Sequence, residues 1–171
     1  MKHEIAMVCA GLILLGTLIQ GEAAELKKQK ATIELEAGKI VIELYEKDAP
    51  GTVANFVKLA KQGYYNGLRF HRVVPGFVVQ GGDPKGDGSG GPGYTIKDEF
   101  NSRKHLTGAV AMAKTAAPNS AGSQFYITLA AQPSLDGKYT VFGQVVEGME
   151  MLMKIRVGDI MKKITIVEVA R

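Results

Sequence analysis

The chain has no tryptophan, a single cysteine and no run of lysine or arginine longer than two residues. Because the cysteine, Cys9, lies in an N-terminal apolar segment, the chain beyond it can form no disulfide and has no thiol nucleophile. The net charge of +4 is spread over scattered side chains and does not build the clustered basic face that binds nucleic acids. We therefore expect no thiol catalysis and no nucleic-acid partner.

Motifs for metals and cofactors are scarce as well. His71 and His105 lie outside any cluster of cysteine, aspartate or glutamate with the spacing of metal ligands. The glycine-rich stretch Gly81–Gly93 contains G-S-G-G-P-G, a formal match to a dinucleotide fingerprint, but that fingerprint must open a helix. Pro92 and the β-prone residues after it, Tyr94 to Ile96, disfavour such a helix. We interpret the stretch as a loop and predict neither metal nor cofactor.

What remains is an ordinary globular composition, with 46% hydrophobic and 22% charged residues in 171, the usual size of one domain. Residues 1–24 stand apart: a short polar start precedes an apolar run from Ile5 to Ile19, and small residues follow. This is the layout of a secretory signal peptide, and the run is shorter than the roughly 18 residues of a spanning helix. We predict cleavage after Ala23 or Ala24 and a periplasmic or secreted protein without stable membrane association. An uncleaved anchor is the alternative.

The polar residues 25–30 are expected to be a mobile lead-in to one domain over residues 31–171. Alternating apolar residues over Ala31–Ala37 and Lys39–Glu46, around Gly38, predict a β-hairpin with one buried face.

Two helices are predicted. Asp48 can cap the first, Gly63 ends it, and its apolar face repeats at helical spacing through Val53, Phe56, Val57 and Ala60. Residues Glu147–Arg156 form the second. Further strands are expected at Leu106–Met112, Gln124–Leu129, Tyr139–Val146 and Ile164–Val169. Many short strands with only two helices favour an antiparallel barrel.

The most informative stretch is Phe70–Asp83, which reads F-H-R-V-V-P-G-F-V-V-Q-G-G-D. Two apolar runs flank a Pro-Gly pair, which predicts a strand, a turn and a strand. Arg72 within it is costly to bury unless its donors are satisfied, so it lies either on the wet face of the hairpin or against a partner. A two-residue turn would place Arg72 opposite Val79, whereas a three-residue loop would place it on the same face as Gln80. Spacing alone leaves both open.

The same stretch resembles the signature of the cyclophilin family of peptidyl-prolyl cis/trans isomerases. Ala111–Thr128 (A-M-A-K-T-A-A-P-N-S-A-G-S-Q-F-Y-I-T) and Leu135–Val145 (L-D-G-K-Y-T-V-F-G-Q-V) resemble two further blocks of that family, in the same order. Together they cover most of the chain from about Ile33. The resemblance implies a mainly β fold, a closed eight-stranded antiparallel β-barrel capped by two α-helices, and an enzyme that acts on proline-containing polypeptides without a cofactor. We expect a monomer.

By resemblance, Arg72 is the catalytic residue and Gln80 orients its guanidinium. The residues implied around the proline ring are Phe77, Val78, Tyr126 and Leu135, and those that hold the preceding peptide are Ala113, Lys114 and Gln124. Tyr139 is predicted to be a further substrate-binding residue. Several depart from the usual pattern of the family, in which methionine replaces Val78, phenylalanine Tyr126, histidine Tyr139 and asparagine Lys114. Rotation about a peptide bond requires none of the lost groups. A proline-binding module or chaperone with weak catalysis remains the alternative to an isomerase.

Overall fold

The computed structural model describes residues 28–169, so the predicted signal peptide at residues 1–24 lies outside the described residues. The described chain contains eight strands, two α-helices and one 3-10 turn. In chain order these are β1 (Lys28–Glu34), β2 (Lys39–Leu44), α1 (Pro50–Lys61), β3 (Arg72–Val74), β4 (Val78–Gly81), β5 (Ala109–Met112), β6 (Phe125–Thr128), the 3-10 turn (Pro133–Leu135), β7 (Val141–Glu147), α2 (Met149–Leu152) and β8 (Lys163–Val169). The predicted class, mainly β with two helices, is confirmed.

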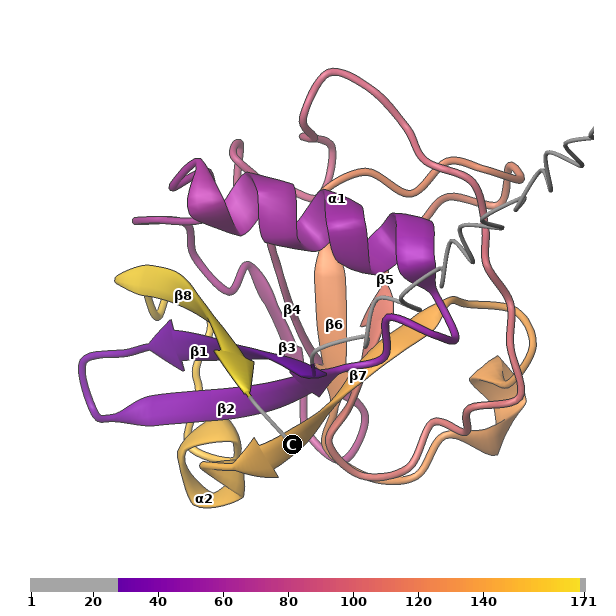
Figure 1. Cartoon of the computed structure of the whole chain (residues 1–171). Coiled ribbons are helices and arrows are strands. Elements are labelled where there is room, and N and C mark those ends of the chain that lie inside the picture. The colour runs from indigo at the N-terminus through magenta and orange to yellow at the C-terminus, as the bar shows by residue number, and fades with distance from the viewer. Residues whose placement is uncertain (1–27, 170–171) are drawn as a thin grey trace, which may run out of the picture.

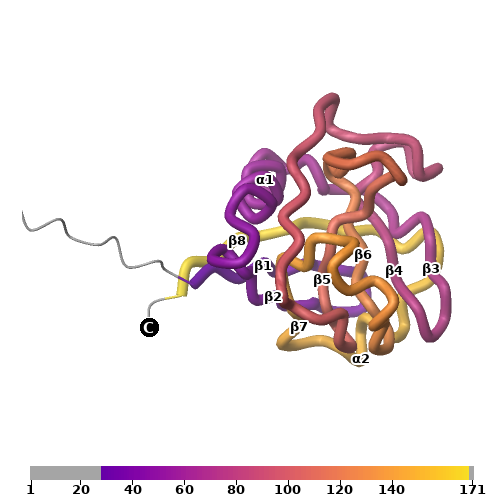
Figure 2. The backbone as a smooth tube through the Cα atoms, turned by 90° about the vertical axis from the view of Figure 1, so that its right-hand side faces the viewer, coloured from indigo at the N-terminus to yellow at the C-terminus, as the bar shows by residue number. Residues whose placement is uncertain are grey.

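All eight strands belong to one antiparallel sheet with the order β3-β4-β6-β5-β7-β2-β1-β8. The sheet curls around the core, with α1 on one side and α2 on the opposite side (Figure 1, Figure 2). Its outermost strands, β3 and β8, are each preceded by irregular chain, and these two irregular segments lie against each other. Gly67 N–H donates to Met161 O at 2.8 Å and Phe70 N–H donates to Asp159 O at 2.9 Å. None of the helices within residues 28–169 has the length and apolarity to span a membrane.

The interior of the sheet is organised around Phe56 of α1. Its ring lies 5.2 Å from Tyr65 and Phe142 and 5.6 Å from Phe125, measured between ring centroids, and all four residues are fully buried. Each large apolar side chain buried in this way contributes about 1.5–3 kcal/mol to stability. The predicted apolar face of α1 therefore fills the core.

The N-terminus of α1 is capped differently from the prediction. Within residues 28–169 the N-cap position is Ala49, which makes no side-chain capping bond, and Asp48 instead pairs with Arg103 at 2.9 Å. The carboxylate of Glu99 accepts the first helical N–H groups, from Gly51 at 3.0 Å and from Thr52 at 2.7 Å. Capping by Asp48 was wrong because its carboxylate is bound to a cation from a distant loop.

Several other boundaries also differ from the sequence prediction. Residues 28–30, expected within a mobile lead-in, belong to β1, where Lys28 pairs with Val169 of β8. The second helix, predicted over 147–156, has only the four residues of α2. Its first predicted residue, Glu147, is still paired in the sheet, and Arg156 N–H donates to the Asp159 carboxylate at 2.9 Å in the next turn. Strand pairing of Glu147 therefore limits the helix at its N-terminal side, and the turn at Arg156 limits it at its C-terminal side.

We predict that Glu99→Ala destabilises the fold by about 1–2 kcal/mol, the usual cost of losing an N-cap. The carboxylate also accepts the Thr52 hydroxyl at 2.7 Å, so three donors lose their acceptor. Urea unfolding followed by circular dichroism measures the change. Glu147→Ala, at an exposed glutamate, is the control. Equal stability of the two variants would contradict the capping role.

Candidate active site

The hairpin formed by β3 and β4 turns through three residues, Pro75 to Phe77. Arg72 pairs with Gln80 and Val74 with Val78, and Phe77 N–H donates to Val74 O at 3.0 Å. Gly76 has a φ of 70°, a left-handed conformation that glycine adopts without a steric cost. Of the two turns left open by the sequence, the three-residue loop is the one present, and it puts Arg72 and Gln80 on one face.

Arg72 is exposed and has a partner at the same time. Its Nη1 donates to Gln80 Oε1 at 3.3 Å, and its guanidinium carbon lies 5.6 Å from the centre of the Phe77 ring. Stacking on a ring restrains an arginine without removing its remaining donors from solvent. Those donors are thus available to a ligand that lies over Phe77.

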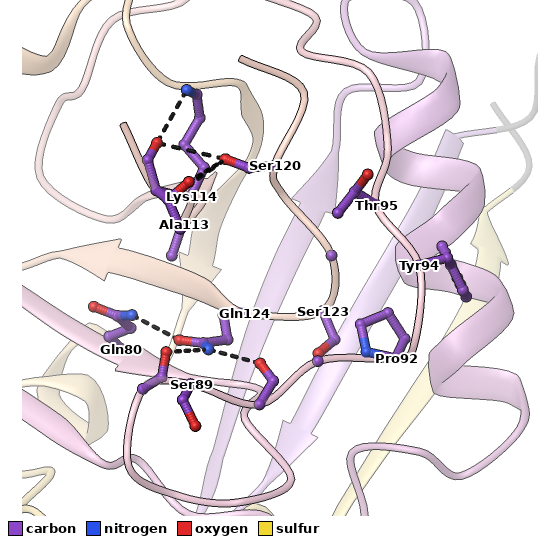
Figure 3. Close-up of a pocket in the computed structure, with 15 residues that line it drawn as sticks. Gln80, Ser89, Pro92, Tyr94, Thr95, Ala113, Lys114, Ser120, Ser123 and Gln124 are labelled. Atoms are coloured by element: carbon purple, nitrogen blue, oxygen red, sulfur yellow. Dashed lines mark hydrogen bonds between the residues drawn. The ribbon is translucent and has the colours of Figure 1, made fainter. Parts of the chain in front are cut away.

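Gln80 is itself held by Gln124 and, through it, by the glycine-rich loop. Gln80 Nε2 donates to Gln124 Oε1 at 3.0 Å, and Gln124 Nε2 donates to the carbonyls of Gly88 and Gly90 at 2.9 and 2.8 Å (Figure 3). Because carbonyls only accept and a guanidinium only donates, the direction of every bond in this chain is fixed. The loop therefore determines which end of the Gln80 amide faces Arg72.

Next to this chain of hydrogen bonds lies a pocket of about 320 Å³. Nine of the ten residues predicted for the site line it: Arg72, Phe77, Val78, Gln80, Ala113, Lys114, Tyr126, Leu135 and Tyr139. The tenth, Gln124, lines a neighbouring pocket of about 330 Å³ that shares Gln80, Ala113 and Lys114 with the first (Figure 3). The structure thus brings all ten predicted residues together.

The pocket is built on the outer face of the sheet. Side chains alternate along a strand, so on β6 Phe125 faces the main core while Tyr126 belongs to a second apolar cluster outside it. That cluster comprises Val78, Ala109, Ala111, Tyr126 and Val141, with Phe77, Leu135 and Tyr139 packed against it. The rings of Tyr126 and Tyr139 meet edge to face with centroids 5.8 Å apart. This leaves a small apolar hollow beside an exposed cation.

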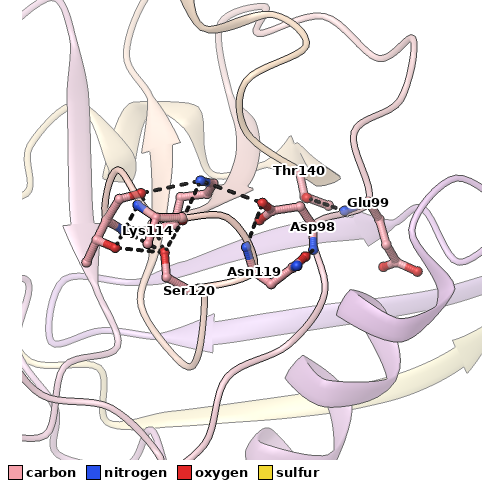
Figure 4. Close-up of polar contacts among 8 residues, drawn as sticks. Asp98, Glu99, Lys114, Asn119, Ser120 and Thr140 are labelled. Atoms are coloured by element: carbon pink, nitrogen blue, oxygen red, sulfur yellow. Dashed lines mark hydrogen bonds and ion pairs between the residues drawn. The ribbon is translucent and has the colours of Figure 1, made fainter.

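Lys114 lines the pocket in a different way from its neighbours. Its ammonium turns back into its own loop, donating to Ala117 O at 3.0 Å and to Thr115 O at 3.3 Å, and lies 3.6 Å from the Asp98 carboxylate. Asp98 also accepts Asn119 N–H at 2.9 Å, which ties the far end of the same loop (Figure 4). The side chain of Lys114 therefore shapes the wall, and the sequence did not indicate this.

A second contact that the sequence did not indicate lies behind Tyr126. Its hydroxyl is 2.9 Å from Nε2 of His105, a residue that the sequence suggested only as a metal ligand to be rejected. Burial raises the pKa of the Tyr126 phenol, so the hydroxyl keeps its proton.

Within residues 28–169, no three histidine, cysteine, aspartate or glutamate side chains come together as metal ligands would.

Known proteins resemble this chain in sequence. A model of the family described as "Cyclophilin type peptidyl-prolyl cis-trans isomerase/CLD" matches residues 30–171. Peptidyl-prolyl cis-trans isomerase B of Bacillus subtilis is 53% identical over 133 residues, which cover 77% of this chain and 92% of the relative. An isomerase of Helicobacter pylori is 50% identical over 142 residues, covering 81% and 86%.

Solved structures resemble this chain in fold. A crystal structure of a Cryptosporidium parvum cyclophilin-type isomerase has a TM-score of 0.78 at 33% identity, covering 84% of this chain and 99% of that one. A structure of the same protein in the presence of the dipeptide Ala-Pro has a TM-score of 0.72 at 32% identity, covering 83% and 99%. On both sequence and fold, the chain belongs to the cyclophilin-type peptidyl-prolyl cis-trans isomerases.

Proposed function

We propose that the pocket binds the proline of an Xaa-Pro segment in a polypeptide and that Arg72 accelerates rotation about the preceding peptide bond. The observation that carries this proposal is the exposed Arg72 guanidinium, held beside an apolar hollow by hydrogen bonds through Gln80 and Gln124. The presence of Ala-Pro with a related protein supports the class of ligand. The protein would act as a monomer on unfolded or partly folded chains.

The reaction needs neither a nucleophile nor a metal. Amide resonance sets a barrier of about 18–20 kcal/mol, and no bond is made or broken when the amide twists. An enzyme has only to bind the twisted amide better than either planar form. In the twisted state the prolyl nitrogen becomes pyramidal and gains a lone pair, which a donor from Arg72 would stabilise. The apolar residues hold the ring while the preceding residue turns.

The apolar residues of the pocket and Arg72 have different roles in this proposal. Phe77, Val78, Tyr126 and Leu135 contact a ring that is unchanged by the reaction, so they bind planar and twisted forms alike. Arg72 faces the one atom whose charge changes, so its contribution belongs to the transition state. A binding module would need the first set but not the oriented cation. The orientation of Arg72 therefore favours catalysis over binding alone.

We also propose that the sheet is closed into a barrel. The support is the pairing between the segments that precede β3 and β8: besides the two bonds given above, Met161 N–H donates to Leu68 O at 2.9 Å and Gly158 N–H donates to Phe70 O at 3.0 Å. A closed sheet has no exposed edge for another strand to join. Closure would also hold β3, and with it Arg72, against the rest of the sheet.

We predict that Arg72→Ala lowers kcat by about 10²–10³-fold, as loss of a preorganised donor does, and changes KM little. Arg72→Lys should recover only part of the rate, because an ammonium lacks the planar fork that Gln80 holds. Exchange spectroscopy of cis and trans peptide at saturating substrate gives the rate, and circular dichroism confirms folding. The control is Arg69→Ala, at an exposed arginine three residues earlier in the chain. A folded Arg72→Ala protein with near-normal kcat would contradict the mechanism.

For localisation, we propose that residues 1–24 direct export and are removed, so that the isomerase works in the periplasm or outside the cell. The support is the order of polar start, short apolar run and small residues in the sequence. An uncleaved segment would instead tether the enzyme to the membrane.

We predict that mass spectrometry of the protein purified from its own host finds an N-terminus near Ala24 or Glu25. The protein should appear in the soluble extracytoplasmic fraction once the apolar run is removed, because none of the helices within residues 28–169 has the length and apolarity to span a membrane. An intact Met1 on membrane-bound protein would show that the segment is an anchor.

A further inference from the structure

We propose that His105 is a positioning residue for prolyl isomerisation, because it links two walls of the pocket, Tyr126 on β6 and the turn that carries Leu135. The proposal rests on the proposed role of the pocket in holding the proline ring. His105 lies behind the pocket, does not line it, and is only 1% exposed. It would therefore act through its neighbours and not by touching the substrate.

The imidazole of His105 is hydrogen-bonded on both sides. Nε2 lies 2.9 Å from the Tyr126 hydroxyl, and Nδ1 lies 3.0 Å from Oδ1 of Asp136, the residue that follows Leu135. The same carboxylate oxygen accepts the backbone N–H of His105 at 2.9 Å. In addition, Gln132 N–H donates to His105 O at 2.8 Å. Three bonds thus attach His105 to the turn, and one attaches it to β6.

The chemistry of the partners determines the direction of these bonds. The backbone N–H and imidazole of His105, together with Lys104 at 3.4 Å, hold the pKa of Asp136 below its usual value. Asp136 is therefore an ionised acceptor, which places a proton on Nδ1 of the imidazole. Nε2 is then left to accept, and the Tyr126 hydroxyl, kept protonated by burial, donates to it. Its proton points away from the pocket.

This direction has a consequence for the substrate. The hydroxyl of Tyr126 is the polar group that the sequence adds where the family usually has phenylalanine. Satisfied from behind by His105, it presents only its ring to the pocket, so an apolar proline meets no unpaired donor. Ring packing reinforces the arrangement: His105 stacks on Tyr126 at 14° with centroids 6.0 Å apart, and Tyr139 meets both rings edge to face. The orientation of Tyr126 is thereby restricted to one ring position.

A pocket that holds an unchanged ring contributes equally to the ground state and to the twisted state. Loosening its walls should therefore raise KM and leave kcat nearly unchanged, the opposite of what removing Arg72 does. This split separates a positioning role in the pocket from a general loss of stability, which would lower the amount of active enzyme and leave KM as it is.

The test is a double-mutant cycle of His105→Phe and Tyr126→Phe, with kcat and KM measured separately on an Xaa-Pro peptide. His105→Phe keeps a flat ring but leaves the Tyr126 hydroxyl buried without an acceptor, and we expect KM to rise about five- to tenfold. In the Tyr126→Phe background, where there is no hydroxyl to satisfy, the same change should raise KM less than about twofold. Leu152→Ala is the control for lost stability. Leu152 belongs to α2, is fully buried in the protein core and does not line the pocket, so this variant should leave KM unchanged.

Nitrogen-15 NMR of histidine-labelled protein in neutral buffer provides a second readout that does not depend on activity. We expect the shifts of a protonated Nδ1 and an unprotonated Nε2 for His105. A protonated Nε2, or an equal rise in KM on His105→Phe in both backgrounds, would overturn the proposal. Should Arg72→Ala abolish turnover while His105→Phe leaves KM unchanged, the isomerase mechanism would stand and the role of His105 would fall.

Discussion

The proposed catalytic arrangement depends on one chain of hydrogen bonds, from the carbonyls of Gly88 and Gly90 through the amides of Gln124 and Gln80 to Arg72. An amide can present either its oxygen or its nitrogen to a neighbour, and only the oxygen attracts a guanidinium. The loop carbonyls remove that choice at Gln124, and Gln124 removes it at Gln80. The glycine-rich loop thus orients the side chain of Arg72, which lies on β3. A cofactor-binding loop would use its backbone to bind phosphate, whereas this loop uses its carbonyls to orient a side chain.

The second constraint is the separation of the two faces of the sheet. Phe56, Phe125 and Phe142 fill the inner face and stabilise the fold, while Tyr126 and Val78 line the outer face and shape the pocket. Because alternate residues of one strand serve these two purposes, the pocket rests on a rigid core. Arg72 itself stays at the open edge of the pocket, where a bound peptide would displace water around it and strengthen its interaction with the amide.

The sequence predicted best what depends on local spacing. Alternation and turn residues located the strands. The resemblance to the family supplied the ten predicted site residues, all of which line two adjoining pockets. The turn at Gly76 stayed open because two loop lengths satisfy the same spacing, and only the cross-strand pairing of Arg72 with Gln80 distinguishes them.

Contacts between distant segments were beyond the sequence. Glu99 caps a helix 47 residues earlier in the chain, and His105 reaches Tyr126 and Asp136 from another loop. Nothing in the spacing of these residues connects them, since they are far apart in the sequence and only the tertiary fold brings them together. Lys114 illustrates the same limit nearby: its side chain could have faced the groove or its own loop, and Asp98 determines the outcome.

We propose that Gln80 acts in catalysis by orienting Arg72. The most direct measurement is kcat, by exchange spectroscopy at saturating peptide, for Gln80→Leu, Arg72→Ala and the double variant. We expect Gln80→Leu to lower kcat about tenfold or more when Arg72 is present and to have almost no further effect when Arg72 is absent. An equal fall in kcat in both backgrounds would show that Gln80 acts independently of Arg72 and does not orient it.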